Sequence, residues 1–237
     1  MNYFPHTLLF ISILFLLFTF VVFLVEFNIV RYAYERVGVG PRFMLLLLLL
    51  SFLGSYVNIP VAQLPPEKMY TQGIVQFFGV PHVVPLIRQS PGTIIAVNVG
   101  GAIVPTLLSL YLIVKNGFYG KALLATAIVT LIVHLLAYPV PGVGIGEPIF
   151  VPPLVTAIVA LAITRQRAAP LAYIAGSLGT LIGADLLNLD KVAGLGAPVA
   201  SIGGAGKFDG IFLTGLIAVL LAGLVSPRHP KPRANSA

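Results

Sequence analysis

Two aspartates flank a glycine-rich stretch of the sequence, and their types and spacing suggest acid–base chemistry. Asp185 and Asp209 are 24 residues apart, and each borders a segment apolar enough to cross a membrane. If these two segments form a hairpin, both carboxyl groups lie at similar membrane depth on adjacent helices. Two carboxyl groups brought close in a low-dielectric site share one proton. Such a pair supplies the general base and the general acid for water to attack a peptide carbonyl.

Further polar residues stand near the ends of other apolar segments. Glu147 lies in "PGVGIGEPIFVPP", and Asn58 and Asn98 lie in "SYVNIP" and "AVNVGG". We expect the two asparagines, near the outer ends of the second and third helices, to form hydrogen bonds between helices. Together with Glu147 and the two aspartates they form a candidate polar cavity on the outer side of the membrane, and Lys207 is a candidate member of the same site.

A purely structural interpretation of the two aspartates stays open. Asp209 has the position of an N-cap or first-turn acid, which the helix dipole favours by about 0.3–1 kcal/mol. Asp185 has Lys191 and Lys207 as candidate ion-pair partners. Against this, an ionised carboxylate at the centre of a membrane helix costs about 2.5–3.5 kcal/mol, so intramembrane acids usually face the bundle interior and serve a function.

The composition is that of a membrane protein. Hydrophobic residues make up 58% and charged residues 9% of the 237 residues, and the mean hydropathy is +1.00. Soluble domains average about 25% charged residues. The net charge is +7, but the basic residues are spread singly over loops. This pattern is typical of residues that set the orientation of membrane spans, and not of a nucleic-acid-binding patch. The chain has no cysteine, and we find no sequence pattern for a metal or cofactor site. Because the composition is that of a membrane protein, membrane lipids are the expected partners.

The hydropathy pattern predicts an all-α polytopic membrane protein with about seven transmembrane helices. A spanning helix needs about 20 mostly apolar residues. The predicted spans are Leu8–Val30, Phe43–Val61, Thr93–Val114, Ala122–Tyr138, Ile149–Ile163, Ala169–Leu187 and Asp209–Val225. They form a single domain over residues 1–225, followed by a disordered basic tail over residues 226–237. Near residues 60–91, short apolar runs separated by proline and glycine predict an extended, β-hairpin-like external segment.

The basic residues predict the orientation of the spans. Those after the first, third, fifth and seventh spans outnumber those in the other loops; they are Arg31, Arg36, Arg42, Lys115, Lys121, Arg165, Arg167, Arg228, Lys231 and Arg233. The positive-inside rule then places the N-terminus outside and the C-terminus in the cytoplasm. We expect an integral protein of a prokaryotic plasma membrane.

The arrangement of the acids resembles that of the diaspartyl intramembrane proteases. These include presenilins, signal peptide peptidases and prepilin peptidases, whose second aspartate lies in a Gly-x-Gly-Asp motif. The resemblance implies that Asp185 and Asp209 are a catalytic pair. This sequence reads "GAGKFD" up to Asp209, so its glycines do not directly precede the aspartate.

A second resemblance covers most of the chain. The stretches "GIGEP" and "GGAGKFDGIFLTG" are similar to the DUF1614 family of polytopic membrane proteins. This resemblance implies a helical membrane fold and carries no activity with it.

Three functional hypotheses follow. The first is an aspartyl intramembrane protease that hydrolyses a transmembrane peptide substrate with Asp185 and Asp209. The second is a proton- or cation-coupled transporter of a small solute or ion that uses the same acids. The third is a non-enzymatic membrane scaffold. An Asp185→Asn variant distinguishes the three. It would lose peptide cleavage if the protein is a protease, gradient-driven flux if it is a transporter, and no more than stability if it is a scaffold.

Overall fold

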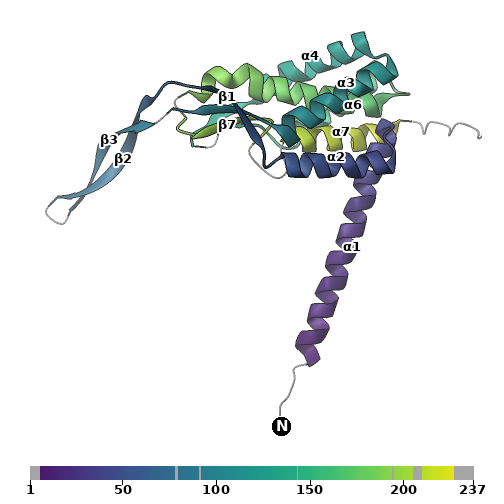
Figure 1. Ribbon diagram of the computed structural model, residues 1–237, viewed down its shortest axis with the longest axis horizontal. Coiled ribbons are helices and arrows are strands. Elements are labelled where there is room, and N and C mark those ends of the chain that lie inside the picture. Colours follow the sequence, from purple (N-terminus) through teal and green to yellow (C-terminus); the bar gives the residue numbers. More distant parts are fainter. Residues whose placement is uncertain are drawn as a thin grey trace, which may run out of the picture.

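The computed structural model describes residues 6–77, 80–90, 92–142, 144–193, 195–204 and 210–226. The described part is mostly helical and carries small sheets at one end of a helical body (Figure 1). Its α-helices are α1 (His6–Val37), α2 (Pro41–Gly54), α3 (Val104–Asn116), α4 (Tyr119–Leu136), α5 (Val151–Ile163), α6 (Ala168–Thr180) and α7 (Gly210–Val225). Its strands are β1 (Asn58–Gln63), β2 (Glu67–Phe77), β3 (Val80–Ser90), β4 (Ile94–Asn98), β5 (Tyr138–Val140), β6 (Gly144–Gly146) and β7 (Val199–Ile202).

The seven predicted helical segments each contain an α-helix, but they differ in length. Four continuous helical stretches are long and apolar enough to cross a membrane, namely Ile11–Val37, Val99–Asn116, Tyr119–Leu136 and Ala168–Val192. The helices α2, α5 and α7 are also apolar but shorter. Large apolar side chains remain exposed on α1 to α5, as expected of surfaces that face lipid.

Helix α6 is the centre of the helical body. Nearly all of its residues are buried, and it contacts α3, α4, α5 and α7. Small residues permit this close packing, as in many membrane bundles. A Cβ at Gly176 would lie 3.3 Å from the Cα of Gly215 on α7, and a Cβ at Gly179 would lie 2.6 Å from Val129 Cγ1 on α4.

A three-stranded sheet replaces two pieces of predicted helix. The strand order is β1-β4-β7, with β1 antiparallel and β7 parallel to β4. The prediction of helix over residues 55–61 and 93–98 is therefore wrong. Pro60 and a run of β-branched residues disfavour helix there, and strand pairing satisfies the backbone groups instead.

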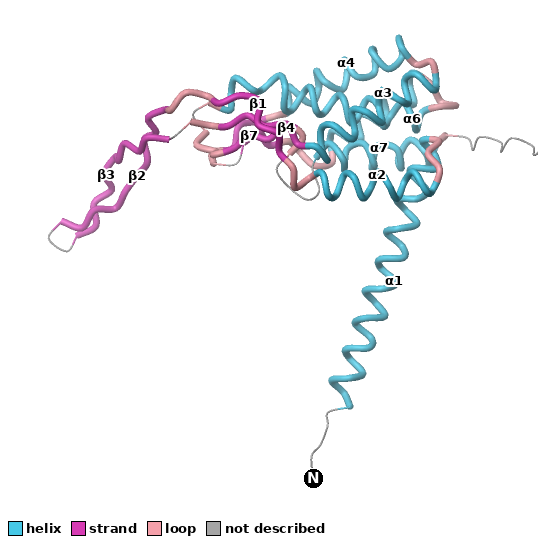
Figure 2. Tube along the Cα trace, in the orientation of Figure 1, coloured by secondary structure: helices cyan, strands magenta, loops and turns pink. Residues whose placement is uncertain are grey.

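The segment near residues 60–91 forms the expected hairpin. Strands β2 and β3 pair along their full length, from Glu67 opposite Ser90 to Phe77 opposite Val80. The hairpin projects from the sheet end, away from the helical body (Figure 2). The prediction of an extended hairpin is confirmed, and its position outside the membrane stays a prediction.

The basic loops meet at the end of the body opposite the sheet, which we call the basic end. Lys115 Nζ, in the last turn of α3, donates to Gly38 O, just after α1, at 2.8 Å. Arg36 Nη1 donates to Ser226 O at 3.2 Å, and Ser226 Oγ donates to Arg165 O at 2.6 Å. Loops that the charge pattern assigned to one side of the membrane therefore lie at one end of the structure.

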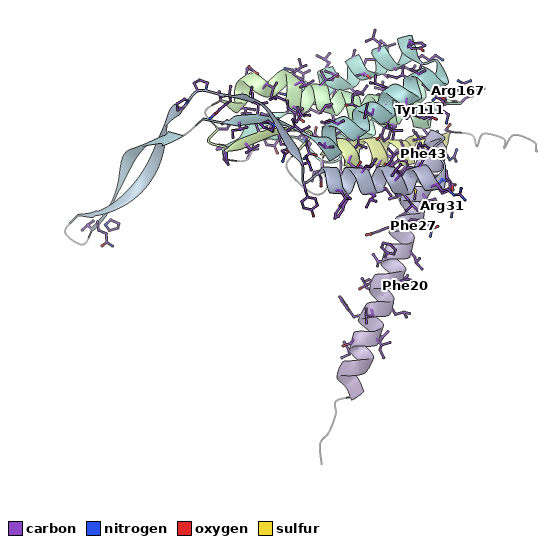
Figure 3. All side chains as sticks on the ribbon, viewed as in Figure 1. Phe20, Phe27, Arg31, Phe43, Tyr111 and Arg167 are labelled. Atoms are coloured by element: carbon purple, nitrogen blue, oxygen red, sulfur yellow. The ribbon has the colours of Figure 1, made fainter. Side chains whose placement is uncertain are left out.

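Helix α1 joins the body at this basic end. Ala33, Tyr34 and Val37 near its C-terminus are buried, whereas its apolar residues 11–25 are exposed. Arg31 on α1 and Arg167 before α6 both lie at the end of the body away from the sheet (Figure 3).

Candidate functional site

Asp185 lies where helix α6 becomes irregular. The α-helical pattern ends at Thr180, a π-helical turn follows over Leu181–Asp185, and a 3₁₀ helix continues over Leu186–Val192. Asp185 is half-buried, and its Oδ2 accepts a hydrogen bond from the backbone N–H of Gly203 at 2.7 Å. This bond joins the end of α6 to the turn after β7 and fixes the orientation of the carboxylate.

Gly203 fits this position because of both its backbone and its surroundings. Its φ is +90°, a value that residues with a side chain rarely adopt. A Cβ at this position would also lie 2.6 Å from the Cβ of Ala102. The residue that binds Asp185 therefore packs directly on the π-helical turn Val99–Ile103, which precedes α3.

Asn98 organises the neighbouring end of α3. Its side chain is 1% exposed. Its Nδ2 donates to Ser55 O at 2.8 Å and to Asn58 Oδ1 at 3.0 Å, while its Oδ1 accepts from Gly101 N at 2.8 Å. Asn98 thus caps the π-helical turn and ties it to the C-terminus of α2. Asn58 and Asn98 do bond to each other, but they are opposed residues of strands β1 and β4, and not residues of two helices as expected.

We expect Asn98→Ala to destabilise the protein by about 2–4 kcal/mol, because it leaves the partly buried Ser55 carbonyl and the buried Gly101 N–H without this partner. The measurement is thermal unfolding in detergent micelles. Asn28→Ala is the control, since the Asn28 side chain is exposed and makes only a local bond to Leu24 O. Equal melting temperatures for the two variants would contradict this role of Asn98.

Ser201 connects the asparagines to the cavity beside Asp185. Ser201 Oγ lies 2.6 Å from Asn58 Oδ1 and 2.9 Å from Gly204 O. A cavity of about 210 Å³ is lined by Asp185, by all four residues of β7, and by Gly144 of β6. The structure therefore brings Asp185, Asn58 and Asn98 into one polar region at the sheet end of the body.

Glu147 lies at the start of α7. A Cβ at Gly210 would overlap the Glu147 Oε1 atom, so this carboxylate lies directly against the first residue of the helix. A negative charge is favourable at a helix N-terminus. Glu147 follows β6, and β6 contacts the π-helical turn that ends at Asp185. Glu147 therefore lies near the cavity, beside the residue that follows Asp209 in the sequence.

Two of the site residues expected from the sequence, Asp209 and Lys207, lie outside the described residues. The pairing of Asp185 with Asp209 accordingly stays a prediction, as does an ion pair with Lys207. Lys191, the other candidate partner of Asp185, donates to Asn188 Oδ1 at 2.7 Å. In the described part of the chain, no three histidine, aspartate or glutamate side chains cluster as metal ligands would.

Sequence reasoning missed Ser201 and Gly203 as members of the site. The stretch "VASIGG" has the signal of a short strand followed by a turn, because its alternating apolar residues end in two glycines. Their contact with Asp185 depends on the fold that brings residues 185 and 203 together.

Comparison with known proteins identifies the family. No curated protein and no solved structure matches the chain. The family model described as "Protein of unknown function (DUF1614)" matches residues 52–221, a region that runs from the end of α2 into α7 and includes every residue of the candidate site. The likeness to diaspartyl proteases stays a prediction from the order of the acids. Since the match covers more than half of its length, the chain belongs to the DUF1614 family.

Proposed function

We propose that this protein is an aspartyl intramembrane protease that hydrolyses peptide bonds of membrane-embedded substrates with Asp185 and Asp209. The observation that best supports the proposal is the position of Asp185 beside β7. Both line the same cavity of about 210 Å³. Among the described residues β7 pairs with β4 alone, so it is an edge strand of the sheet.

An edge strand next to an acid suits a peptide substrate. A transmembrane helix has its carbonyl groups bonded internally, so a segment must become extended before water can attack it. An extended peptide adds readily to an exposed sheet edge through main-chain hydrogen bonds. A peptide that paired with β7 would run along the cavity, with a carbonyl group near Asp185.

The chemistry requires two carboxyl groups in different protonation states. One aspartate removes a proton from water as the water oxygen attacks the carbonyl carbon. The other donates its proton to the amide nitrogen as the C–N bond breaks. The products are a carboxylic acid and an amine, and the pair together regains its single shared proton. Glu147, against the start of α7, adds a further carboxyl group to this region.

The test is cleavage of peptides in proteoliposomes. The purified protein is reconstituted with a library of transmembrane peptides, and the products are identified by mass spectrometry. The proposal expects cut peptides with the natural chain and cleavage at least about a hundredfold slower with Asp185→Asn or Asp209→Asn. Cleavage at the rate of the natural chain in either variant would refute it.

The irregular helices favour a second candidate function, cation- or proton-coupled transport. α3 begins and α6 ends with a π-helical turn, and the two turns meet through Gly203, which packs on one and bonds to the other. Broken helices beside intramembrane acids are typical of transporter binding sites. Uptake driven by a pH or sodium gradient, lost in Asp185→Asn, would support transport in place of proteolysis.

A further inference from the structure

We propose that a groove between α2 and α3 binds an anionic glycerophospholipid, with an acyl chain along the groove and the phosphate at Lys115. The groove has a volume of about 420 Å³ and lies apart from the cavity beside Asp185. Its lining is apolar except at one end, where it reaches Lys115 and the loop Gly38–Gly40. The proposal is independent of any proteolytic activity.

The walls of the groove follow from helical spacing. Phe43, Leu47 and Leu50 lie on one face of α2, at intervals of four and three residues, as neighbours along one helix face do. Leu107 and Tyr111 line the facing side of α3 in the same way. Phe43, Leu50, Leu107 and Tyr111 remain roughly half exposed or more. In a membrane such a surface faces acyl chains and not water.

The groove has the dimensions of one leaflet. Along α3 it runs from Val104 to Lys115, which is about 17 Å at about 1.5 Å per residue. Half of a bilayer's hydrocarbon core is about 15 Å thick. Because Lys115 lies at the basic end of the body, the apolar length of the groove matches one acyl chain and Lys115 lies at the level of the lipid phosphates. Figure 3 shows Phe43 and Tyr111 near the basic end, where the groove opens.

The charged end of the groove suits a phosphate. Lys115 Nζ donates to Gly38 O at 2.8 Å and lies 5.4 Å from the centre of the Tyr111 ring. An ammonium group has three N–H donors, so the bond to Gly38 O leaves two for another acceptor. The N-terminus of α2, at Gly40, has no side-chain cap and borders the same opening. An uncapped helix N-terminus beside an ammonium group favours an anion.

An anionic lipid fits the expected membrane side as well. The cytoplasmic leaflet is the negatively charged one, and it attracts basic residues close to the membrane surface. The positive-inside prediction places the basic end at this leaflet. Arg42, exposed in the first turn of α2, adds a second cation at the same end of the body. A zwitterionic lipid would offer the same acyl chains but a weaker electrostatic match.

The experiment is lipid titration of the delipidated protein in detergent, followed by native mass spectrometry. Phosphatidylglycerol is the anionic probe and phosphatidylcholine is the zwitterionic one. We expect Lys115→Gln to weaken phosphatidylglycerol binding about tenfold, the loss of one charge-assisted contact, and to leave phosphatidylcholine binding unchanged. Lys121→Gln is the matched control, since Lys121 is exposed in the first turn of α4, six residues further along the chain, and does not line the groove.

A second pair of variants tests the groove itself. Leu107→Trp would fill it, and because Leu107 is 60% exposed the fold should tolerate the change. Leu123→Trp is the control, at an exposed site on α4 outside the groove. We expect only Leu107→Trp to remove bound phosphatidylglycerol. Three results would overturn the proposal. The first is equal binding of phosphatidylglycerol and phosphatidylcholine, and the second is an equal effect of a variant and its control in either pair. The third is a lipid-free dimer that Leu107→Trp dissociates, because a second copy of the chain would then occupy the groove.

Discussion

Asp185→Asn is expected to lower peptide cleavage in proteoliposomes about 10²–10⁴-fold, the usual contribution of a positioned acid or base. Asparagine has nearly the same shape, and its side-chain oxygen still accepts the hydrogen bond that Gly203 N donates to Asp185 Oδ2. It holds no proton to exchange with a second carboxyl group, however. The change therefore removes the shared proton and preserves the contact between α6 and the turn after β7.

The control for this loss is Asp190→Asn. Asp190 is exposed on the 3₁₀ helix that follows Asp185, so it carries the same change of charge without facing the cavity. The expected result is full cleavage in Asp190→Asn, the 10²–10⁴-fold lower rate in Asp185→Asn, and equal melting temperatures. If Asp185→Asn instead lost ion or solute flux and the natural chain cut no peptide, transport would be the function. A change in stability alone would indicate a scaffold.

Gly100→Ala is expected to destabilise the protein by about 3 kcal/mol, at the upper end of the usual cost of overpacking. A Cβ at Gly100 would overlap the carbonyl oxygen of Ser51 and the amide nitrogen of Ser55, and it would lie 2.9 Å from the carbonyl carbon of Gly54. These are backbone atoms, so no side-chain rotation relieves the overlap. The π-helical turn and the end of α2 must then move apart, which also strains the bond between Asn98 and Ser55 O.

Thermal unfolding in detergent measures this effect, and a loss of about 3 kcal/mol corresponds to a melting temperature about 6–12 °C lower for a chain of this size. Gly120→Ala is the matched control, because no atom lies within 4 Å of a Cβ there and alanine favours helix. An unchanged melting temperature for Gly100→Ala would mean that α2 and the start of α3 do not approach each other as described.

The helices could be predicted because their signal is local. Long apolar runs marked α1, α4 and α6, and the alternation of basic loops predicted which helix ends share one end of the body. Lys115 bonding to Gly38 O and Arg36 bonding to Ser226 O agree with that grouping. The prolines and glycines between residues 60 and 91 likewise marked the hairpin β2–β3.

The three-stranded sheet could not be predicted because its pairings are distant in the sequence. Ile94 of β4 pairs with Val199 of β7, and Asn58 of β1 pairs with Asn98. A strand such as "IIAVN" is short and apolar and directly precedes an apolar helix. Its hydropathy therefore cannot be distinguished from that of the first turns of the helix. The irregular turns at the ends of α3 and α6 depend on the same distant contacts.

The candidate site was predictable only in part, for the same reason. Residue type identified Asp185, Glu147, Asn58 and Asn98, since polar groups beside apolar spans are costly without a role or a partner. Gly203 and Ser201 contribute a backbone group and a small side chain, so their residue types give no comparable signal in the sequence. Their place beside Asp185 follows from β7 pairing with β4.

The claim that the two aspartates meet is tested most directly by joining them. The chain has no cysteine, so Asp185→Cys combined with Asp209→Cys gives one defined thiol pair. Asp190→Cys with Asp209→Cys is the control. Membranes are treated with a short thiol-to-thiol bifunctional reagent, and the linked peptides are identified by mass spectrometry. We predict a cross-link between positions 185 and 209 and little cross-linking between 190 and 209. The account would be contradicted if the thiols at 185 and 209 each reacted with the reagent but were never joined to each other.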